Sequence, residues 1–269
     1  MSREVPVAAT VAELRAFVRT RRALGERIGL VPTMGALHVG HLSLIEAARQ
    51  RADRVVATIF VNPTQFGANE DFSRYPRTFD ADRAQLAQVD ADLVFAPAVT
   101  EMYPVGFVTT VSLAGPASAG LEDRFRPTHF AGVATVVAKL LNQAQADVAV
   151  FGEKDYQQLL VIRQMARDLD IPTEIYGAPT LRESDGLALS SRNVYLSEAE
   201  RARAPALHQA LDAASRAIAR GASIDETMAQ ARHAVTTAGF EIDYIEARDA
   251  QTLAPVKDGA AGPLRILAA

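Results

Sequence analysis

IGLVPTMGALHVGH, residues 28–41, runs from a short apolar segment through a glycine-containing loop into a segment of helical period. A strand that ends at Pro32 and a helix that begins near Val39 leave TMGALH as the connection. In open α/β sheets such connections lie at the carboxyl ends of the strands, where these folds bind ligands. The stretch therefore predicts both a strand-loop-helix unit and a binding loop.

Two histidines, His38 and His41, lie three residues apart at the predicted start of this helix. Free backbone N–H groups and the helix dipole attract anions there, and Gly40 leaves room for a ligand to approach the backbone. Imidazole N–H groups could stabilise charge on a departing pyrophosphate. The pair could equally be a polar cap, a chance pair or half of a metal site. We assign no metal site, because no acidic or histidine partner stands nearby at a ligand-like spacing.

Apolar runs alternate with segments of helical period over the first two thirds of the chain, which predicts right-handed crossovers and a doubly wound parallel sheet of the Rossmann-like α/β class. The expected strands are 28–31, 55–61, 92–96, 147–152 and 173–177, and the expected helices are 39–53, 80–89, 131–146 and 155–169.

The rhythm changes near residue 178. Residues 178–193 resemble a loop, 197–223 and 225–239 have the pattern of alanine-rich amphipathic helices, and 240–249 and 264–269 alternate like half-exposed strands. Ser197 and Ser223 are suitable N-caps for the two helices. We expect a first domain of residues 1–178 and a smaller α+β domain of residues 179–269.

Composition excludes several classes of protein. With 28 basic and 32 acidic side chains the net charge is −4, which does not favour nucleic acid or an anionic membrane as a partner. The N-terminus lacks the apolar core of a signal peptide, and Lys139 interrupts the longest apolar stretch well short of a membrane span. Without cysteine there is no thiolate chemistry. We expect a cytoplasmic protein.

Polar side chains follow other predicted strands at the same edge of the sheet. Each group alone could be a turn, a helix cap or a solvated linker, but together they predict one site for a phosphorylated ligand and a small polar substrate. No P-loop motif is present. The groups are Asn62 and Gln65 in VNPTQF, Gly152, Lys154, Asp155 and Gln158 in FGEKDYQQL, and Ser190, Ser191 and Arg192 in LALSSRN.

These motifs resemble those of a known family. PTMGALHVGH resembles the HxGH loop of the nucleotidylyltransferase superfamily related to class I aminoacyl-tRNA synthetases, and LSSR resembles its degenerate KMSKS loop. With IFVNPTQF, YPRT, RPTHFAGV, FGEKDYQQL and SDGLALSSRN, the set is similar to the pantothenate synthetase (pantoate–β-alanine ligase) family over nearly the whole chain.

The resemblance implies an enzyme that condenses pantoate with β-alanine in two half-reactions. Pantoate would attack the α-phosphorus of ATP, giving pantoyl adenylate and pyrophosphate, and β-alanine would then displace AMP. It also implies Mg²⁺ bound with ATP and a homodimer formed through the first domain. We carry over no protein ligand for the metal.

The resemblance also assigns residues. His41 would donate a proton to the departing group, and His38, Lys154, Ser190, Ser191 and Arg192 would act with it on the phosphates. Gln65 and Gln158, with Asn62 beside them, would bind pantoate, and Gln65 would also lie near β-alanine. The ATP site would comprise Met34, Gly35, Ala36, Leu37, His38, Val39, Gly40, His41, Gly152, Glu153, Lys154, Asp155, Leu181, Leu189, Ser190, Ser191 and Arg192.

One departure and two alternatives remain. The family usually continues beyond RILAA through a further short strand, so we expect a trimmed chain or a disordered tail, with a consequence for the stability of the second domain. A nucleotidylyltransferase that moves AMP onto a phosphate acceptor would share HxGH, but it would need basic side chains where Gln65 and Gln158 stand. A nucleotide-sensing module with a decayed site would bind ATP without turnover.

Overall fold

A six-stranded parallel sheet forms the centre of the computed structural model, which describes residues 4–67, 70–260 and 262–269. The strands lie in the order β1-β4-β3-β2-β5-β6. Most of their residues are buried, as expected for a sheet covered on both faces. The strands are β1 (Val7–Ala8), β2 (Ile28–Val31), β3 (Arg54–Thr58), β4 (Leu93–Phe95), β5 (Val148–Gly152) and β6 (Glu174–Ala178).

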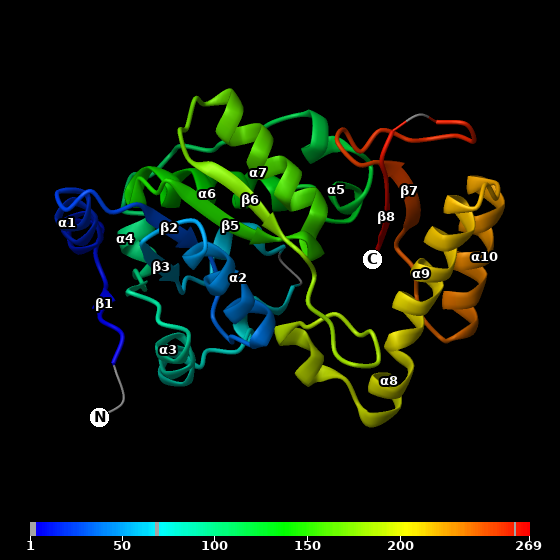
Figure 1. Ribbon diagram of the computed structural model, residues 1–269, viewed down its shortest axis with the longest axis horizontal. Coiled ribbons are helices and arrows are strands. Elements are labelled where there is room, and N and C mark those ends of the chain that lie inside the picture. The colour runs from blue at the N-terminus through cyan, green and yellow to red at the C-terminus, as the bar shows by residue number, and fades with distance from the viewer. Residues whose placement is uncertain (1–3, 68–69, 261) are drawn as a thin grey trace.

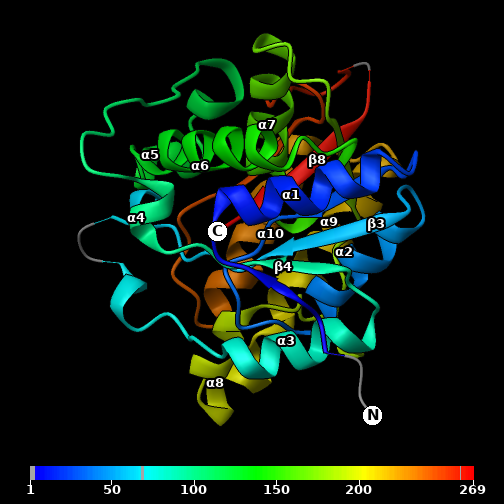
Figure 2. The same ribbon diagram turned by 90° about the vertical axis from the view of Figure 1, so that its left-hand side faces the viewer.

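Helices cover both faces of this sheet (Figures 1 and 2). On one face α1 (Val11–Arg22), α6 (His129–Ala144) and α7 (Tyr156–Asp168) share a core with the strands, built around residues such as Leu14, Leu141 and Ile162. On the other face lie α2 (Val39–Arg49) and α3 (Phe79–Gln88), whose Ile45 and Leu86 enter a second core. Short helices α4 (Val99–Met102) and α5 (Glu122–Phe125) lie in the connection from β4 to α6.

The predicted α/β class is confirmed, and each expected strand and helix of the sheet region is present with ends shifted by a few residues. The N-terminal pair β1 and α1 was not expected. Its strand has only two residues, and Thr10 caps the helix through a capping box with Glu13 that the sequence reading overlooked.

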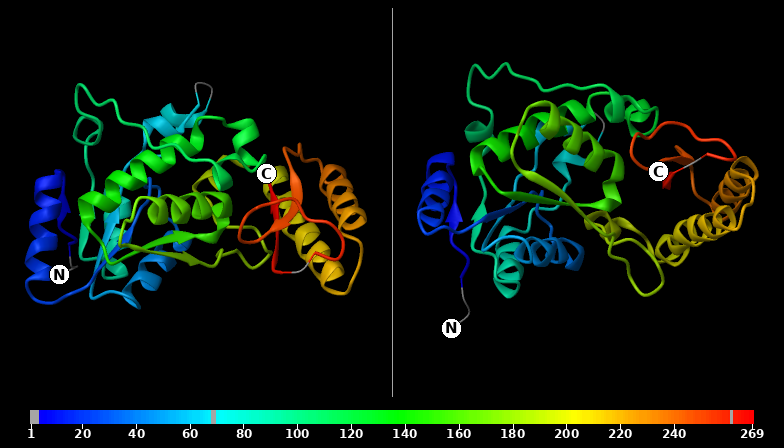
Figure 3. Two further views of the ribbon diagram at one scale, coloured as in Figure 1. Left: turned by 90° about the horizontal axis from the view of Figure 1, so that it is seen from above. Right: turned by 45° about the horizontal axis from the view of Figure 1, so that its top comes forward.

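The remaining elements gather at one end of the molecule (Figure 3). They are α8 (Glu198–Arg203), α9 (Pro205–Ala219), α10 (Ile224–Thr237) and the antiparallel strands β7 (Ile245–Asp249) and β8 (Leu264–Ala268). Apolar side chains of α9 and α10 pack against this small sheet and form a separate core.

The expected helix over 197–223 is wrong in one respect, because it divides into α8 and α9 before Pro205, whose ring nitrogen carries no hydrogen to bond. The expected strand over 240–249 begins only at Ile245. Both predicted caps are confirmed: Ser197 accepts a hydrogen bond from the amide of Glu200, and Ser223 accepts one from Glu226.

Strand order places the site. From β2 the chain adds β3 and then β4 on one side, and it returns to the other side of β2 to add β5. The direction in which strands are added therefore reverses between the parallel neighbours β2 and β5. The connections after these two strands therefore diverge and leave a crevice at their carboxyl ends. Within the described residues no helix is long and apolar enough to cross a membrane.

Candidate active site

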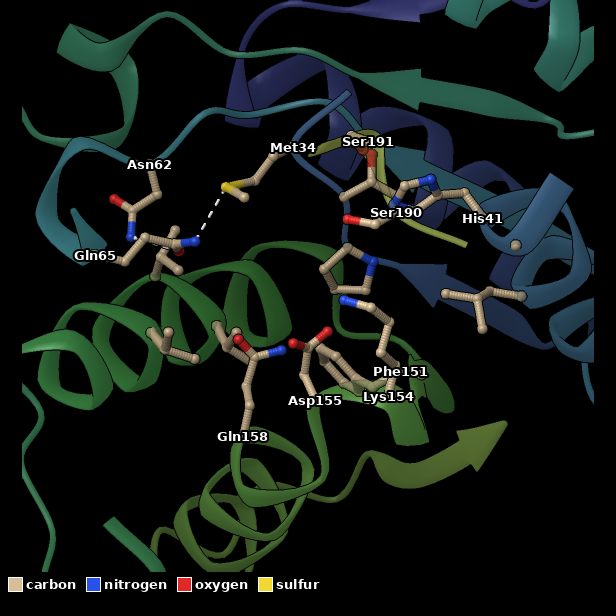
Figure 4. A pocket seen from close by; sticks show the side chains of 18 of the residues that line it. Met34, His41, Asn62, Gln65, Phe151, Lys154, Asp155, Gln158, Ser190 and Ser191 are labelled. Atoms are coloured by element: carbon tan, nitrogen blue, oxygen red, sulfur yellow. Dashed lines mark hydrogen bonds between the residues drawn. The ribbon is translucent and has the colours of Figure 1, made fainter. Parts of the chain in front are cut away.

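A cavity of about 270 Å³ opens at this point of the sheet. Lys154, Asp155 and Gln158 rise into it from the segment after β5, facing His41, Gln65 and the serines of the 190s segment (Figure 4). Thirteen of the predicted residues line it: Met34, Gly40, His41, Asn62, Gln65, Gly152, Lys154, Asp155, Gln158, Leu181, Ser190, Ser191 and Arg192.

The two histidines of HxGH cap helix α2 with each other. The amide of Gly40 donates to Nδ1 of His38 at 3.1 Å, and the amide of His38 donates to Nδ1 of His41 at 3.3 Å. The ring centroids lie 4.1 Å apart. Since each Nδ1 accepts a hydrogen bond, the proton of each neutral ring lies on Nε2, which remains available as a donor.

Both rings favour the neutral form. Burial lowers the pKa of His41 to about 3, with smaller contributions from the neighbouring His38 and Lys154, and opposed by Asp155. Burial, followed by the charge of Lys154, also lowers the pKa of His38. Neutral rings can donate from Nε2 at physiological pH, whereas a bound polyphosphate would favour proton uptake.

Gly40, which lines the cavity, also has a use that the sequence did not suggest. A Cβ at this position would lie 2.9 Å from Cε1 and Nδ1 of His38. That distance is shorter than carbon atoms tolerate, so the glycine is required by the histidine cap itself. His38 lies beside His41 rather than in the cavity lining.

The loop before the histidines is held by a buried carboxylate that sequence reasoning missed. Asp82, on α3 and 1% exposed, accepts hydrogen bonds from the amides of Ala36 at 2.9 Å and Leu37 at 2.8 Å. Thr78 donates a third at 3.1 Å, and Gly35 donates its amide to Thr33 at 3.2 Å. Ala36 adopts a positive φ of 49°.

This arrangement turns several backbone donors of the loop away from the cavity. Phosphate recognition therefore falls mainly to side-chain N–H and O–H groups, unlike in a P-loop. Gly35, Ala36 and Leu37, predicted for ATP, do not line the cavity, and Val39 is 62% exposed.

Gln65 is held on three sides. Its Oε1 accepts from Nδ2 of Asn62 at 3.2 Å, and its Nε2 donates to Sδ of Met34 at 3.0 Å (Figure 4). The backbone carbonyl of Gln65 accepts from Arg126 at 3.2 Å and from Nδ1 of His129 at 2.9 Å. The amide thus reaches the cavity in a fixed orientation.

Asn62, predicted to contact substrate, has its hydrogen-bonding groups occupied by protein. It is 1% exposed; Nδ2 also donates to the carbonyl of Gly132 at 3.3 Å, and Oδ1 accepts from Tyr103 at 2.8 Å and from Thr64. Since an amide offers only two donors and two lone pairs, Asn62 serves to orient Gln65.

Lys154 and Gln158 are more open. Among the described residues neither side chain has a hydrogen-bond or ion-pair partner, so both can serve a ligand. Lys154 brings a positive charge opposite the histidines. Glu153, predicted for the nucleotide, instead pairs with Arg265 at 2.9 Å.

The LSSR segment reaches across to the first sheet. Oγ of Ser191 donates to the carbonyl of Ala36 at 3.0 Å, and Arg192 forms two hydrogen bonds with Asp71 at 2.9 and 3.0 Å. Leu189, predicted for ATP, does not line the cavity, and its amide donates to the carbonyl of Leu181. Arg192 is thus at the cavity but engaged by a carboxylate.

Sequence reasoning missed other parts of the lining. Arg126 and His129 come from RPTHF, which contributes to the family resemblance without an assigned role, and Arg126 is paired with Glu70 and Glu122. An apolar wall had no polar signal to mark it; it includes Phe60, Phe66, Tyr75, Val133, Val136, Val137, Leu140 and Phe151.

Together these groups suit adenylation of a carboxylic acid. Cationic and neutral N–H donors face one side of the cavity, where phosphate charge would build up. Fixed amides and an apolar wall face the other side, where a small hydroxy acid would fit. The described residues contain no group of three or more histidine, acidic or cysteine side chains able to hold a metal ion.

Comparisons with known proteins agree with this chemistry. The family model described as pantoate-beta-alanine ligase matches residues 6–269. A pantothenate synthetase from a Bradyrhizobium species is 54% identical over 269 residues, covering 100% of this chain and 95% of that protein. One from Caulobacter vibrioides is 58% identical over 254 residues, covering 94% and 89%.

Solved structures give the same result. The pantothenate synthetase of Thermus thermophilus superposes with a TM-score of 0.91 at 50% identity, covering 96% of this chain and 92% of that one. The pantoate-beta-alanine ligase of Francisella tularensis, complexed with beta-gamma ATP and beta-alanine, gives a TM-score of 0.76 at 35% identity, covering 90% and 89%.

Proposed function

Because the chain belongs to the pantoate–β-alanine ligase family, we propose that the cavity between β2 and β5 is where ATP activates pantoate and β-alanine captures the product. The family's reaction is the ATP-dependent condensation of pantoate with β-alanine to pantothenate. It passes through pantoyl adenylate and releases pyrophosphate and then AMP.

The first half-reaction is a substitution at the α-phosphorus. The pantoate carboxylate attacks, the bond to the bridging oxygen breaks, and the electron pair leaves with pyrophosphate. Most of the catalysis in such a step comes from positioning and charge stabilisation. We assign charge stabilisation to Lys154, Arg192 and the Nε2 protons of His38 and His41.

The mutual cap explains how two histidines can serve this step. Their Nδ1 atoms are fixed by backbone amides, so their Nε2–H groups are oriented before ATP arrives. A donor that is already oriented need not reorganise as charge builds up on the leaving group. His41, which lines the cavity, is proposed to donate a hydrogen bond from its Nε2–H to the departing pyrophosphate, which stabilises the leaving group's charge while the ring stays neutral.

Pantoate is proposed to lie between Gln65 and Gln158. Neutral amides can hold a hydroxyl or carboxylate without neutralising the negative charge that makes the carboxylate a nucleophile. Ser190, Ser191 and the backbone of Leu181 are proposed to contact the nucleotide, with Asp155 on its ribose.

Mg²⁺ is proposed to arrive bound to ATP. Magnesium keeps several waters and is commonly held by substrate phosphates with one or two carboxylates, so it needs no dedicated protein cage. Its action would be to neutralise part of the phosphate charge during attack.

Three further assignments are proposals: the two domains rest on the change of sequence pattern near residue 178, the homodimer rests on the family resemblance, and the location rests on composition. Residues 1–178 and 179–269 form two domains, the second closing over the first as a lid. The first domain forms a homodimer, which light scattering on the purified chain would test. The enzyme works in the cytoplasm, without nucleic acid or membrane partners.

The observation that carries the proposal is the convergence on one cavity of side chains from four separate segments: His41, Gln65, Lys154 with Gln158, and Ser190 to Arg192. Incubation with ATP, pantoate and isotopically labelled β-alanine should give labelled pantothenate and one equivalent of AMP by mass spectrometry. Formation of ADP instead of AMP, or a product lacking the label, would refute it.

A further inference from the structure

His129 lies where the first cavity meets a second one. The second cavity, of about 400 Å³, reaches toward α9 and β8 and shares part of its lining with the first. The shared residues are Arg126, His129, Lys154, Asp155, Gln158 and Thr180. The His129 ring therefore borders both the predicted pantoate site and a separate approach to it.

The tautomer of this ring follows from its one hydrogen bond. Nδ1 lies 2.9 Å from the backbone carbonyl of Gln65, and a carbonyl can only accept, so Nδ1 carries the proton. In the neutral ring Nε2 then has a lone pair. Among the described residues nothing donates to this lone pair, and the ring lines both cavities. The neutral His129 ring is therefore the opposite tautomer to His38 and His41, whose Nε2 atoms carry the proton.

The second half-reaction needs such a group. A primary amine of pKa about 10.4 is ammonium at neutral pH in all but roughly one molecule in 10³, and ammonium has no lone pair with which to attack. The groups assigned to charge stabilisation in the first half-reaction are N–H donors, so they cannot accept this proton, and the one carboxylate of that assignment, Asp155, is proposed to be occupied by the ribose. A base beside Gln65 would convert bound ammonium to amine.

We propose that His129 is the general base of amide formation, taking a proton from the β-alanine ammonium through Nε2. This inference rests on the proposed function, since it assigns a residue to the second half of that reaction. β-Alanine enters through the second cavity, while pantoyl adenylate fills the first.

Each proton and electron pair of amide formation has a destination. Nε2 accepts one proton from the ammonium, and the freed nitrogen lone pair attacks the acyl carbon and forms the C–N bond. The C–O bond to the phosphate then breaks, its electron pair leaving with AMP. The nitrogen's second proton leaves with the phosphate or to water, and the imidazolium returns its proton to solvent.

The surroundings keep His129 neutral before the reaction. Burial is the main cause of its lowered pKa; the Gln65 carbonyl opposes it, Arg126 lowers it further, and Glu122 and Glu70 raise it. A buried ammonium also loses its preference for the charged form, which brings donor and acceptor closer in proton affinity.

His129→Asn separates this role from a merely structural one. The Asn side-chain NH₂ can still donate to the Gln65 carbonyl, as Nδ1 does, but it has no lone pair in place of Nε2. Pantoate-dependent exchange of pyrophosphate into ATP should stay within about twofold of wild type. AMP release with β-alanine should fall by about 10²–10⁴-fold, the usual range for a lost general base. His233→Asn, the same change on the exposed face of α10, should alter neither.

Two readouts decide the chemistry. Hydroxylamine is largely unprotonated at neutral pH, so it should consume the adenylate at a nearly normal rate in His129→Asn. With β-alanine, the variant's residual rate should rise tenfold per pH unit, following free amine. A normal rate with β-alanine would overturn the proposal, and so would loss of exchange, which would leave His129 only an anchor for Gln65.

If His129→Asn does not fold, the wild-type enzyme still gives a test. Single-turnover decay of preformed adenylate should rise tenfold per pH unit with β-alanine only below neutral pH and then level off, well below the pH at which the free amine forms in solution. A tenfold rise per unit continuing through neutral pH would show that no base on the enzyme takes part. Failure of wild type to form adenylate at all would refute the proposed function instead.

Discussion

The histidines of HxGH show how one residue can cap a helix through one ring nitrogen and leave the other nitrogen for the proposed catalysis. Reading the sequence treats a cap and a phosphate ligand as alternatives, because a residue type does not say which nitrogen is used. In the structure Nδ1 of His38 and of His41 caps helix α2, and Nε2 remains for chemistry. The two readings are therefore compatible.

Titration of His41 is the first prediction at this scale. The folded ring should take up a proton only near pH 3, whereas the unfolded ring does so near its ordinary pKa of about 6.5. Since the unfolded chain then binds more protons, the contribution of this ring to stability is present above pH 6.5 and lost as pH falls toward 3.

NMR of the ring, assigned by its loss in His41→Ala, would follow this titration with the urea-unfolded chain as reference. Saturating ATP should raise the midpoint, because phosphate charge favours the imidazolium. A midpoint near 6.5 in the free protein would contradict the cap geometry.

At the scale of elements, the loops after β2, β3 and β5 could be predicted because strand ends and polar residues both appear in the sequence. Their supports could not. Asp82 looks like an ordinary acid in the first turn of a helix, and nothing local shows that it bonds to amides 45 and 46 residues earlier. His129 and Arg126 likewise reach back to Gln65 across more than 60 residues.

Asp82→Asn should impair catalysis beyond its effect on stability. One side-chain oxygen becomes an NH₂ group that faces an amide donor of Ala36 or Leu37, so the loop must shift. A displacement of about 1 Å can lower kcat by about 10²-fold, and we expect a loss of this size in pyrophosphate exchange.

Asp92→Asn is the matched control, because Asp92 is also a buried carboxylate that accepts a backbone amide, from Val55, although it pairs with Arg49 and Arg54 as well. It should lower the melting temperature with little change in kcat of the folded fraction. Equal kcat losses in the two variants would show that Asp82 is only a structural residue.

Gly132→Ala should move the Gln65 loop. Alanine favours a helix by about 1 kcal/mol over glycine, but its Cβ would lie 2.2 Å from the carbonyl oxygen of Thr64, which is backbone and cannot rotate away. The clash with the Thr64 backbone therefore outweighs the gain in helix propensity. The Gln65 loop must shift, and KM for pantoate should rise far more than KM for ATP. Steady-state kinetics with each substrate varied would check this, and unchanged KM values would show that the loop can yield freely.

On the scale of the whole molecule, alternation of apolar runs and helical segments was sufficient to predict the parallel sheet and the edge that carries the site. It could not predict how the last third of the chain approaches that edge. Arg192 and Asp71 are 121 residues apart, and their pairing depends on tertiary packing alone. The same contact region joins Tyr195 to the carbonyl of Arg74 at 3.1 Å.

Asp71→Asn should lower KM for ATP. ATP phosphates must compete with Asp71 for Arg192, and the pair is partly exposed, so its contribution is about 0–1 kcal/mol, or up to about a fivefold change. Asp185→Asn, which removes an exposed pair with Arg201, is the control. A raised KM for ATP would show instead that Asp71 directs Arg192 toward phosphate.

The most direct test of the central claim, that this cavity forms an acyl adenylate with help from His41, is exchange of labelled pyrophosphate into ATP without β-alanine. Wild type should exchange only when pantoate is present. His41→Ala should fold normally and lose about 2.7–4 kcal/mol of transition-state stabilisation, a rate loss of about 10²–10³-fold. Exchange without pantoate, or undiminished exchange in His41→Ala, would contradict the account.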